Sequence, residues 1–258
     1  MADAKISALT SLTGAGAAQD DLLAIVDVSA STTKKITREE FFSSIDKIAF
    51  DTVNVDATPV DGELTWDTTE NTLLLGLNGG ATTLHIGQEM HYRVRNATGV
   101  QIAKGTVVRF SGVVGGSGNL TVAPALANGT YPSNYIIGVT TEDIANGADG
   151  LVTHFGKVRG VNTSAFAVGD VLYASPSVSG GFTTTRPEAP NNIVSMAAVL
   201  SSGNNGTIFV RPSVEDIWQA VPATATSAGR KGDNAFDANY FYVCVATNTW
   251  KRVALSTW

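Results

Sequence analysis

The sequence predicts a mainly β protein made of antiparallel β-sandwich or barrel modules, with one short N-terminal helix and a C-terminal β-hairpin module. From Asp51 onward, apolar and polar residues alternate with a period of two over segments short enough to be strands. Turn signals such as Asn78-Gly79-Gly80 and Asn128-Gly129 separate these segments. Charged residues make up only 16% of the chain and glycine occurs 26 times, a composition typical of short strands joined by tight turns.

Residues 1–50 are expected to form a separate unit that attaches the protein to a larger particle, with a strand followed by a short helix. The apolar run Leu22–Val26 is flanked by acidic residues, which indicates a short buried strand. Thr37 and Glu40 have the spacing of a capping box at a helix start. The apolar positions that follow recur at helical spacing and would form one stripe, the candidate attachment face: Phe41, Phe42, Ile45 and Ile48. Because so short a helix is marginal in water, this face must pack on its own chain, on another protein or across a trimer axis.

Residues 51–219 are expected to form a β-rich body of two similar lobes. Segments 135–156 and 192–213 share one order of features: an apolar strand, a turn rich in Asn and Gly, and a second apolar strand. This weak internal repeat indicates a duplicated hairpin unit. Residues 220–258 begin with a linker rich in Ala, Thr, Pro and Gly and end in a hairpin module.

The C-terminal hairpin carries a group of aromatic residues, namely Tyr240, Phe241, Tyr242, Trp250 and Trp258. Two strands alone are marginally stable in water, so these rings have three possible roles. They could fill the core of the small module, lie buried between subunits, which we favour, or face a sugar or host receptor. Cys244, the only cysteine, lies in the alternating run and is expected to be a small strand residue.

Charge and hydropathy exclude several classes of function. The formal net charge of −6 argues against a nucleic-acid partner, which would require clustered Lys and Arg. The chain has no apolar run of bilayer length and begins without a secretory signal, so no membrane insertion is expected.

No motif in the sequence points to a metal, a cofactor or a catalytic residue. His85, His91 and His154 lack the spacing of a metal pair, and a single cysteine cannot form a thiolate cluster. Ser117 lies in a glycine-rich stretch that lacks the pattern of a nucleophile turn. The expectation is therefore that the chain is not an enzyme and binds no cofactor.

One group of acids leaves an alternative open. Glu63, Asp67 and Glu70 lie close in sequence to Trp66, and a carboxylate pair beside an aromatic platform is what a glycosidase needs. The simpler interpretation is a strand end and a turn with solvated acids.

Several segments resemble virion proteins of tailed bacteriophages. Residues 5–14, KISALTSLTG, and 20–37, ending in a TTKKIT turn before the expected helix, resemble the start of many tail-fibre and other virion proteins. Residues 62–108 look like a β module of the same class. Residues 138–163 and 168–199 are similar in turn placement to small capsid-decoration proteins, and residues 223–258 resemble the terminal hairpin of phage fibres.

The resemblance implies a structural protein on the outer surface of the virion, assembled in the host cytoplasm. It would be a homotrimeric knob, a capsid cement or decoration protein like a head fibre, because no fibre shaft is visible. The alternative is a short tail-fibre or tailspike component that recognises the host surface. Expected partners are further copies of the chain, the major capsid protein or a tail or portal-proximal protein, and a host-surface polysaccharide. Two other classes are not favoured. The sequence lacks the recognisable catalytic constellation that a cell-wall or capsule hydrolase needs, and it lacks the export signal that a host-encoded adhesin would need.

Overall fold

The computed structural model describes residues 22–27, 32–37, 47–50, 52, 58–116, 118–188, 191–215 and 219–258. The chain divides into the compact units Met1–Asp51 and Thr52–Trp258. Regular structure in the described ranges is almost entirely β-strand, with two 3-10 turns, η3 (Asn78–Gly80) and η4 (Ser133–Tyr135). The predicted mainly β class is therefore confirmed. None of the helical turns in these ranges could cross a membrane.

The described residues of the first unit include one antiparallel strand pair. Strand β1 (Leu22–Asp27) pairs with β2 (Thr32–Thr37) in a register that places Leu22 opposite Thr37. The predicted strand at Leu22–Val26 is thus confirmed. The expectation of a turn at TTKKIT is wrong, since these residues form β2, and their β-branched Thr and Ile side chains favour extended backbone.

The structure does not support the N-terminal helix. Thr37, the expected capping residue, ends β2, and Lys47–Phe50 are not helical. A Thr that pairs in a strand ladder is no longer free to begin a helix, so the capping-box spacing misled the prediction. Phe41, Phe42 and Ile45 lie outside the described residues, and the Ile48 side chain is exposed.

The second unit begins with a small antiparallel sheet, the β3–β5 sheet. It contains β3 (Leu64–Asp67), β4 (Thr72–Leu77) and β5 (Thr82–His85) in sequential order. The turn into β4 contains Asn71 and the turn after it contains Asn78, both with positive φ, as tight turns require. The sheet is short, but its strand ends carry the polar groups of the candidate site.

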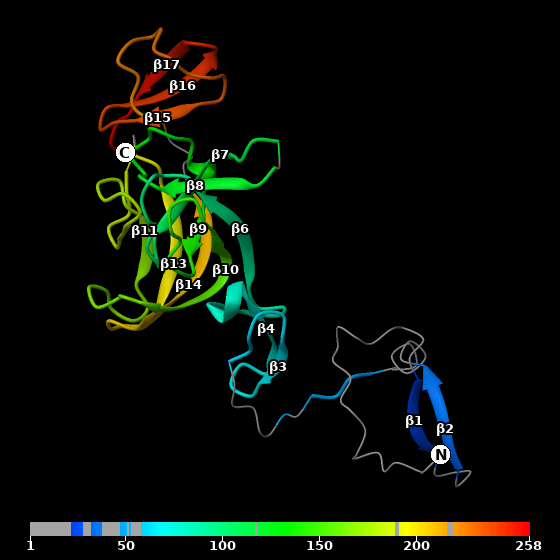
Figure 1. Cartoon of the computed structure of the whole chain (residues 1–258). Helices are drawn as coiled ribbons and strands as arrows, with labels where there is room; N and C mark the ends of the chain where they lie inside the picture. Colours follow the sequence, from blue (N-terminus) through cyan, green and yellow to red (C-terminus); the bar gives the residue numbers. More distant parts are fainter. Residues whose placement is uncertain are drawn as a thin grey trace. The chain divides into compact units, whose positions relative to one another are not determined.

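A closed barrel follows the β3–β5 sheet (Figure 1). Its strands are β6 (Met90–Asn96), β7 (Val107–Val113), β8 (Leu120–Pro124), β9 (Ile136–Thr140) and β10 (Asp149–Val161). Strand β10 pairs with both β6 and β9, so the order β10-β6-β8-β7-β9 closes on itself into five strands. Aliphatic side chains from these strands and their connections form one core cluster: Val94, Ile102, Val108, Val122, Ile144 and Val152.

The long strand β10 also carries the rest of the nine-stranded sheet. Its second half pairs with β14 (Gly206–Val214), followed in order by β13 (Val194–Ser201), β11 (Val171–Ala174) and β12 (Phe182–Thr183). A second, larger core includes Val139, Val158, Leu172, Met196 and Ile208. The two segments with similar sequence patterns both form antiparallel pairs, β9 with β10 and β13 with β14.

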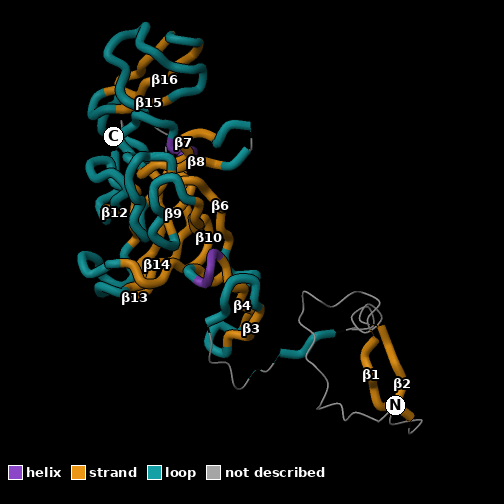
Figure 2. Tube along the Cα trace, viewed as in Figure 1, coloured by secondary structure: helices purple, strands orange, loops and turns teal. Residues whose placement is uncertain are grey.

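The chain ends in a separate three-stranded sheet (Figure 2). The predicted hairpin is confirmed as β16 (Tyr240–Ala246) and β17 (Thr249–Ala254), and β15 (Asn234–Phe236) pairs with β16 as a third strand. Ala235, Tyr242, Cys244 and Trp250 form its core. Cys244 is a buried strand residue, as predicted.

Candidate functional site

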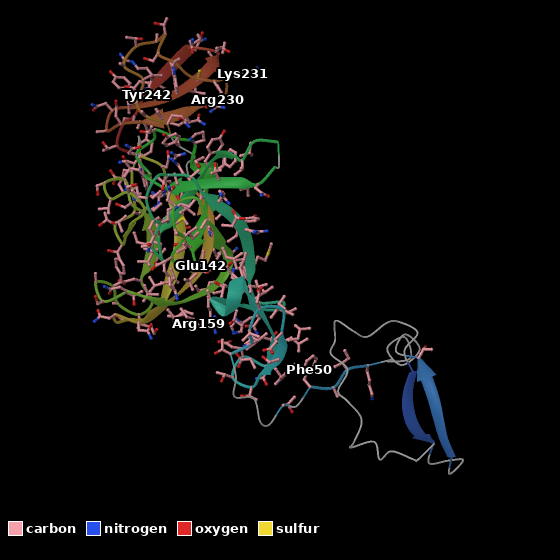
Figure 3. The ribbon with its side chains drawn as sticks, in the orientation of Figure 1. Phe50, Glu142, Arg159, Arg230, Lys231 and Tyr242 are labelled. Atoms are coloured by element: carbon pink, nitrogen blue, oxygen red, sulfur yellow. The ribbon has the colours of Figure 1, made fainter. Side chains whose placement is uncertain are left out.

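A polar cavity of about 460 Å³ lies where the β3–β5 sheet meets strand β10; we call it the junction pocket. Its walls include one tryptophan and several charged or titratable side chains: Trp66, Asp67, His85, His91, Lys104, Lys157 and Arg159. Six threonines are also among the residues that line it. Figure 3 labels Arg159 on β10, beside the β3–β5 sheet.

The imidazole of His85 lies between two carboxylates. Its Nδ1 is 2.9 Å from Glu89 Oε2, and its Nε2 is 3.3 Å from Asp67 Oδ2. The backbone N–H of His85 also donates to Glu89 Oε2 at 3.1 Å. His85 ends β5 and Asp67 ends β3, while the turn after β5 brings Glu89 back over the ring. Only a ring protonated on both nitrogens can donate to both carboxylates at once.

Basic side chains from β10 complete this network. Lys157 Nζ donates to Glu70 Oε1, and Arg159 donates to Glu70 Oε1 at 3.3 Å and to Glu89 Oε1 at 2.9 Å. Lys157 and Arg159 stand two apart on the strand, so their side chains share one face. These ion pairs tie the β3–β5 sheet to the barrel.

A second polar contact reinforces the same junction. The Asn78 side-chain amide lies 2.8 Å from both carboxylate oxygens of the buried Glu142, labelled in Figure 3. Glu142 also accepts the backbone N–H of Leu151 at 2.9 Å. The β3–β5 sheet is therefore joined to the barrel by two sets of polar contacts.

The network lowers the pKa of each of its three carboxyl groups. Burial alone would raise the pKa of Glu89, but hydrogen bonds from His85 and Arg159 outweigh it. The pKa of Glu70 is lowered chiefly by the hydrogen bond from Lys157. For Asp67, burial again opposes the shift, and the backbone N–H groups of Glu70 and Thr69 lower the pKa. All three acids are thus stabilised as carboxylates.

His91 has a different environment. Burial lowers the pKa of His91, against the opposing influence of Glu89 and the Thr83 backbone. Its side chain is 4% exposed, and its Nδ1 lies 3.2 Å from Thr153 Oγ1. Its Nε2 makes no hydrogen bond to any described residue. The ring is therefore a neutral, buried group with unused hydrogen-bonding capacity.

The structure brings together only part of the acid group noted in the sequence. Asp67 and Glu70 both join the network, and Trp66 lines the same pocket as Asp67. Glu63 is exposed and instead accepts the backbone N–H of Val60 at 3.0 Å. Ser117 lies outside the described residues.

Sequence reasoning missed Glu89 and the two histidines as members of the site. The closeness of His85, Glu89 and His91 in the sequence was an available signal, because a buried imidazole near a carboxylate is often functional. His154 contacts the Ile137 carbonyl elsewhere on the barrel. The described residues contain no group of three or more side chains suited to hold a metal ion.

The C-terminal aromatics lie apart from this pocket and differ from one another in exposure. Tyr242 is 7% and Trp250 6% exposed, whereas Trp258 is fully exposed. Tyr240 lies beneath the Arg252 guanidinium, 4.1 Å from its ring centroid, and Phe241 stands opposite Val253 in the β16–β17 ladder. The core of the small module thus buries two of the five rings, and the partly buried Tyr240 packs against it.

Two bacteriophage proteins share part of this sequence, while no family model matches the chain. "Depolymerase 1, capsule K30/K69-specific" of Klebsiella phage K5-2 is 49% identical over 57 residues, which are 22% of this chain and 7% of the relative. "Depolymerase, capsule K30/K69-specific" of Klebsiella phage K64-1 is 32% identical over 136 residues, 49% of this chain and 16% of the relative. The chain thus spans a small part of either relative. This similarity confirms the relation to phage proteins that the sequence predicted.

One solved structure is also similar, the head fiber gp8.5 N base in bacteriophage phi29. It has 16% sequence identity and a TM-score of 0.31, with 47% of this chain and 93% of that chain covered. A TM-score this low supports no inference about fold or function.

These relatives overturn one expectation. The sequence motifs led us to expect that the chain is not an enzyme, and that expectation is contradicted because both relatives are named as depolymerases. Motif searches look for residues close together in sequence, whereas polysaccharide-cleaving carboxylates need only be close in space.

Proposed function

We propose that the chain is an exterior component of a tailed-phage particle, of the tail-fibre or tailspike class, that binds host capsular polysaccharide as part of a depolymerase. The observation that carries this proposal is the 32% identity to a capsule depolymerase over 136 residues, about half of the chain. A protein that acts on a capsule must stand where the particle meets the cell. This reasoning favours the tail over our first expectation of a capsid knob.

The size and lining of the junction pocket also support the proposal. Its volume of about 460 Å³ is within the usual range for small-ligand sites. It combines a tryptophan with carboxylates, basic groups and hydroxyls, and this mixture suits a carbohydrate. The proposed partners of the chain are host-surface polysaccharide, the particle protein that carries it, and further copies of itself.

Binding to capsule tests the proposal directly. The purified chain would be immobilised and exposed to capsular polysaccharides from a panel of Klebsiella strains that includes the K30 and K69 types. We expect it to retain at least one capsule type, and the release of reducing ends would be measured in the same samples. A folded chain that retains no capsule in the panel contradicts the proposal.

Localisation tests the placement on the particle. Gold-labelled antibody against the chain should mark the tail in electron micrographs of the virion. Gold label confined to the head would contradict the tail position and favour a capsid protein instead. We further propose that the copies form a homotrimer. Light scattering should then give the mass of a trimer, and a monodisperse monomer at micromolar concentration would contradict this part of the proposal.

A further inference from the structure

We propose that the junction pocket binds a negatively charged sugar unit of a surface polysaccharide, with the sugar carboxylate at Lys104 and a polar group at His91 Nε2. This inference rests on the proposed function and adds the site and the chemical class of its ligand.

The acidic groups of the pocket are occupied within the protein. Asp67 Oδ1 accepts two backbone N–H groups and Asp67 Oδ2 faces His85. Glu89 and Glu70 are paired with His85, Lys157 and Arg159. Lys157 and Arg159 offset two of the three negative charges, which weakens the repulsion of an anion by the acids.

Lys104 and the Trp66 indole are donors left without a partner among the described residues, and the exposed Thr68 and Thr69 hydroxyls can both donate and accept. Lys104 is exposed and makes no ion pair with any described residue. Among the described residues, no group accepts a hydrogen bond from the Trp66 indole N–H or from the Thr68 and Thr69 hydroxyls. A ligand that satisfies these donors must supply acceptors, and the unpaired ammonium of Lys104 favours a negatively charged one.

His91 provides an independent indication that something binds here. Its side chain is 4% exposed and lines the pocket, yet Nε2 has no hydrogen-bond partner among the described residues. A buried polar group without a hydrogen-bond partner is unfavourable, so a ligand or water at Nε2 would relieve that cost. As a neutral ring, His91 can either donate to a sugar oxygen or accept from a sugar hydroxyl.

The size of the pocket and the presence of Trp66 favour a sugar over a bare anion. A volume of about 460 Å³ exceeds what a single carboxylate or phosphate needs. The apolar face of an indole packs against the C–H face of a pyranose, as aromatic rings do with other amphipathic partners. An acidic sugar meets all of these requirements together.

Isothermal titration with three defined probes tests the assignment. Oligogalacturonate of four units supplies acidic sugars, maltotetraose supplies neutral sugars of the same length, and acetate supplies the carboxylate alone. We expect oligogalacturonate to bind at least about tenfold more tightly than either control, and its affinity should fall as salt rises. Equal affinity for maltotetraose would overturn the charge requirement, and equal affinity for acetate would overturn the sugar requirement.

Matched variants locate the binding. Lys104→Gln removes the unpaired cation from an exposed position, and Lys251→Gln makes the same change at an exposed position of β17. Lys104→Gln should lower the affinity for oligogalacturonate by about tenfold while Lys251→Gln leaves it unchanged. Equal effects of the two variants would place binding elsewhere.

A spectroscopic readout completes the design. The His91 ring signals in an imidazole NMR spectrum should shift when oligogalacturonate is added to the parent chain, and unmoved signals would contradict the contact at Nε2.

The proposed function and the proposed sugar site can fail separately. Capsule retention without pocket-dependent oligogalacturonate binding leaves the proposed function standing, whereas pocket-dependent binding without capsule retention leaves only the site.

Discussion

Gly156 and Glu89 are packed directly against each other at the junction of the barrel with the β3–β5 sheet. A β-carbon at Gly156 would lie 2.6 Å from Glu89 Cγ, and the φ of Gly156 is +119°. Both facts make glycine necessary at this position of β10. Glu89 can therefore reach Arg159 and His85 only because strand β10 has no side chain here.

Gly156→Ala should destabilise the protein by about 1–3 kcal/mol, because the added methyl displaces a buried carboxylate and strains the backbone. Urea denaturation measures the change in the free energy of unfolding. Gly116→Ala is the matched control, since its added methyl would meet nothing within 4 Å and Gly116 is not at positive φ. A Gly156→Ala variant as stable as Gly116→Ala would show that Glu89 can move at no cost.

Glu89→Gln should cost more stability than Glu70→Gln, although both remove one negative charge. The Glu89 side chain is 2% exposed, whereas that of Glu70 is 22% exposed and its pairs with Lys157 and Arg159 are open to solvent. Loss of a buried, hydrogen-bonded charge costs about 1–3 kcal/mol, while a solvent-exposed pair contributes about 0.2–1 kcal/mol. Thermal melts of both variants at pH 7 provide the comparison, and equal losses would contradict the burial argument.

Stability should begin to fall as the pH drops below 6.5, the ordinary pKa of His91. Because burial lowers the His91 pKa in the folded state, the unfolded chain binds a proton that the folded chain excludes. The groups that face His91 are Glu89, His85, Thr83 and Thr153, and the attraction of Glu89 limits the shift. Melting temperatures from pH 8 to about pH 5 measure the effect.

His91→Gln removes this titration and serves as the control for the pH series. Its melting temperature should be flatter than that of the parent through the window just below pH 6.5. A further loss of stability should remain in both proteins below pH 4.5, the ordinary value for Glu70, because the lowered carboxyl pKa values favour folding only above that window. Identical curves for parent and variant would assign the first loss to another group.

Trp250→Ala should unfold the C-terminal sheet, whereas Trp258→Ala should not. Trp250 is 6% exposed, donates from Nε1 to the Ser227 carbonyl at 3.1 Å, and packs against Gly229. Removal of a buried tryptophan costs about 3–5 kcal/mol, more than a three-stranded module of this size can lose. Limited proteolysis followed by mass spectrometry would show cleavage in residues 220–258 for Trp250→Ala only. An equally resistant Trp250→Ala variant would mean that subunit contacts, not the module's own core, hold the sheet.

The strands were predictable because their signal is local. The alternation of side-chain types in Tyr240–Ala246 and the apolar run at Leu22–Val26 each predict a strand, and neither prediction depends on the rest of the chain. The prediction of a helix around Phe41 is not supported because Thr37, its expected capping residue, pairs with Leu22 in a strand ladder. The local sequence allows both a helix start and a strand at Thr37, and only the pairing with a distant strand decides between these two structures.

The barrel and the junction pocket could not be predicted in the same way. Closure depends on Val152 pairing with Thr140 on one side and Tyr92 on the other, and no period in the sequence encodes both partners. Glu70 meets Lys157 across 87 positions of sequence, so its role is visible only after folding. Where contacts are distant in sequence, composition indicates the fold class but not the site.

Barrel closure has a consequence for how copies of the chain can associate. The five barrel strands have neighbours on both sides, so the described part of the nine-stranded sheet ends at a single edge, β12, which is two residues long. Long open edges allow strands of separate molecules to add to one another without limit. The nine-stranded sheet therefore offers one short described edge for backbone pairing with another copy, whereas the smaller β3–β5 and β15–β17 sheets keep open edge strands.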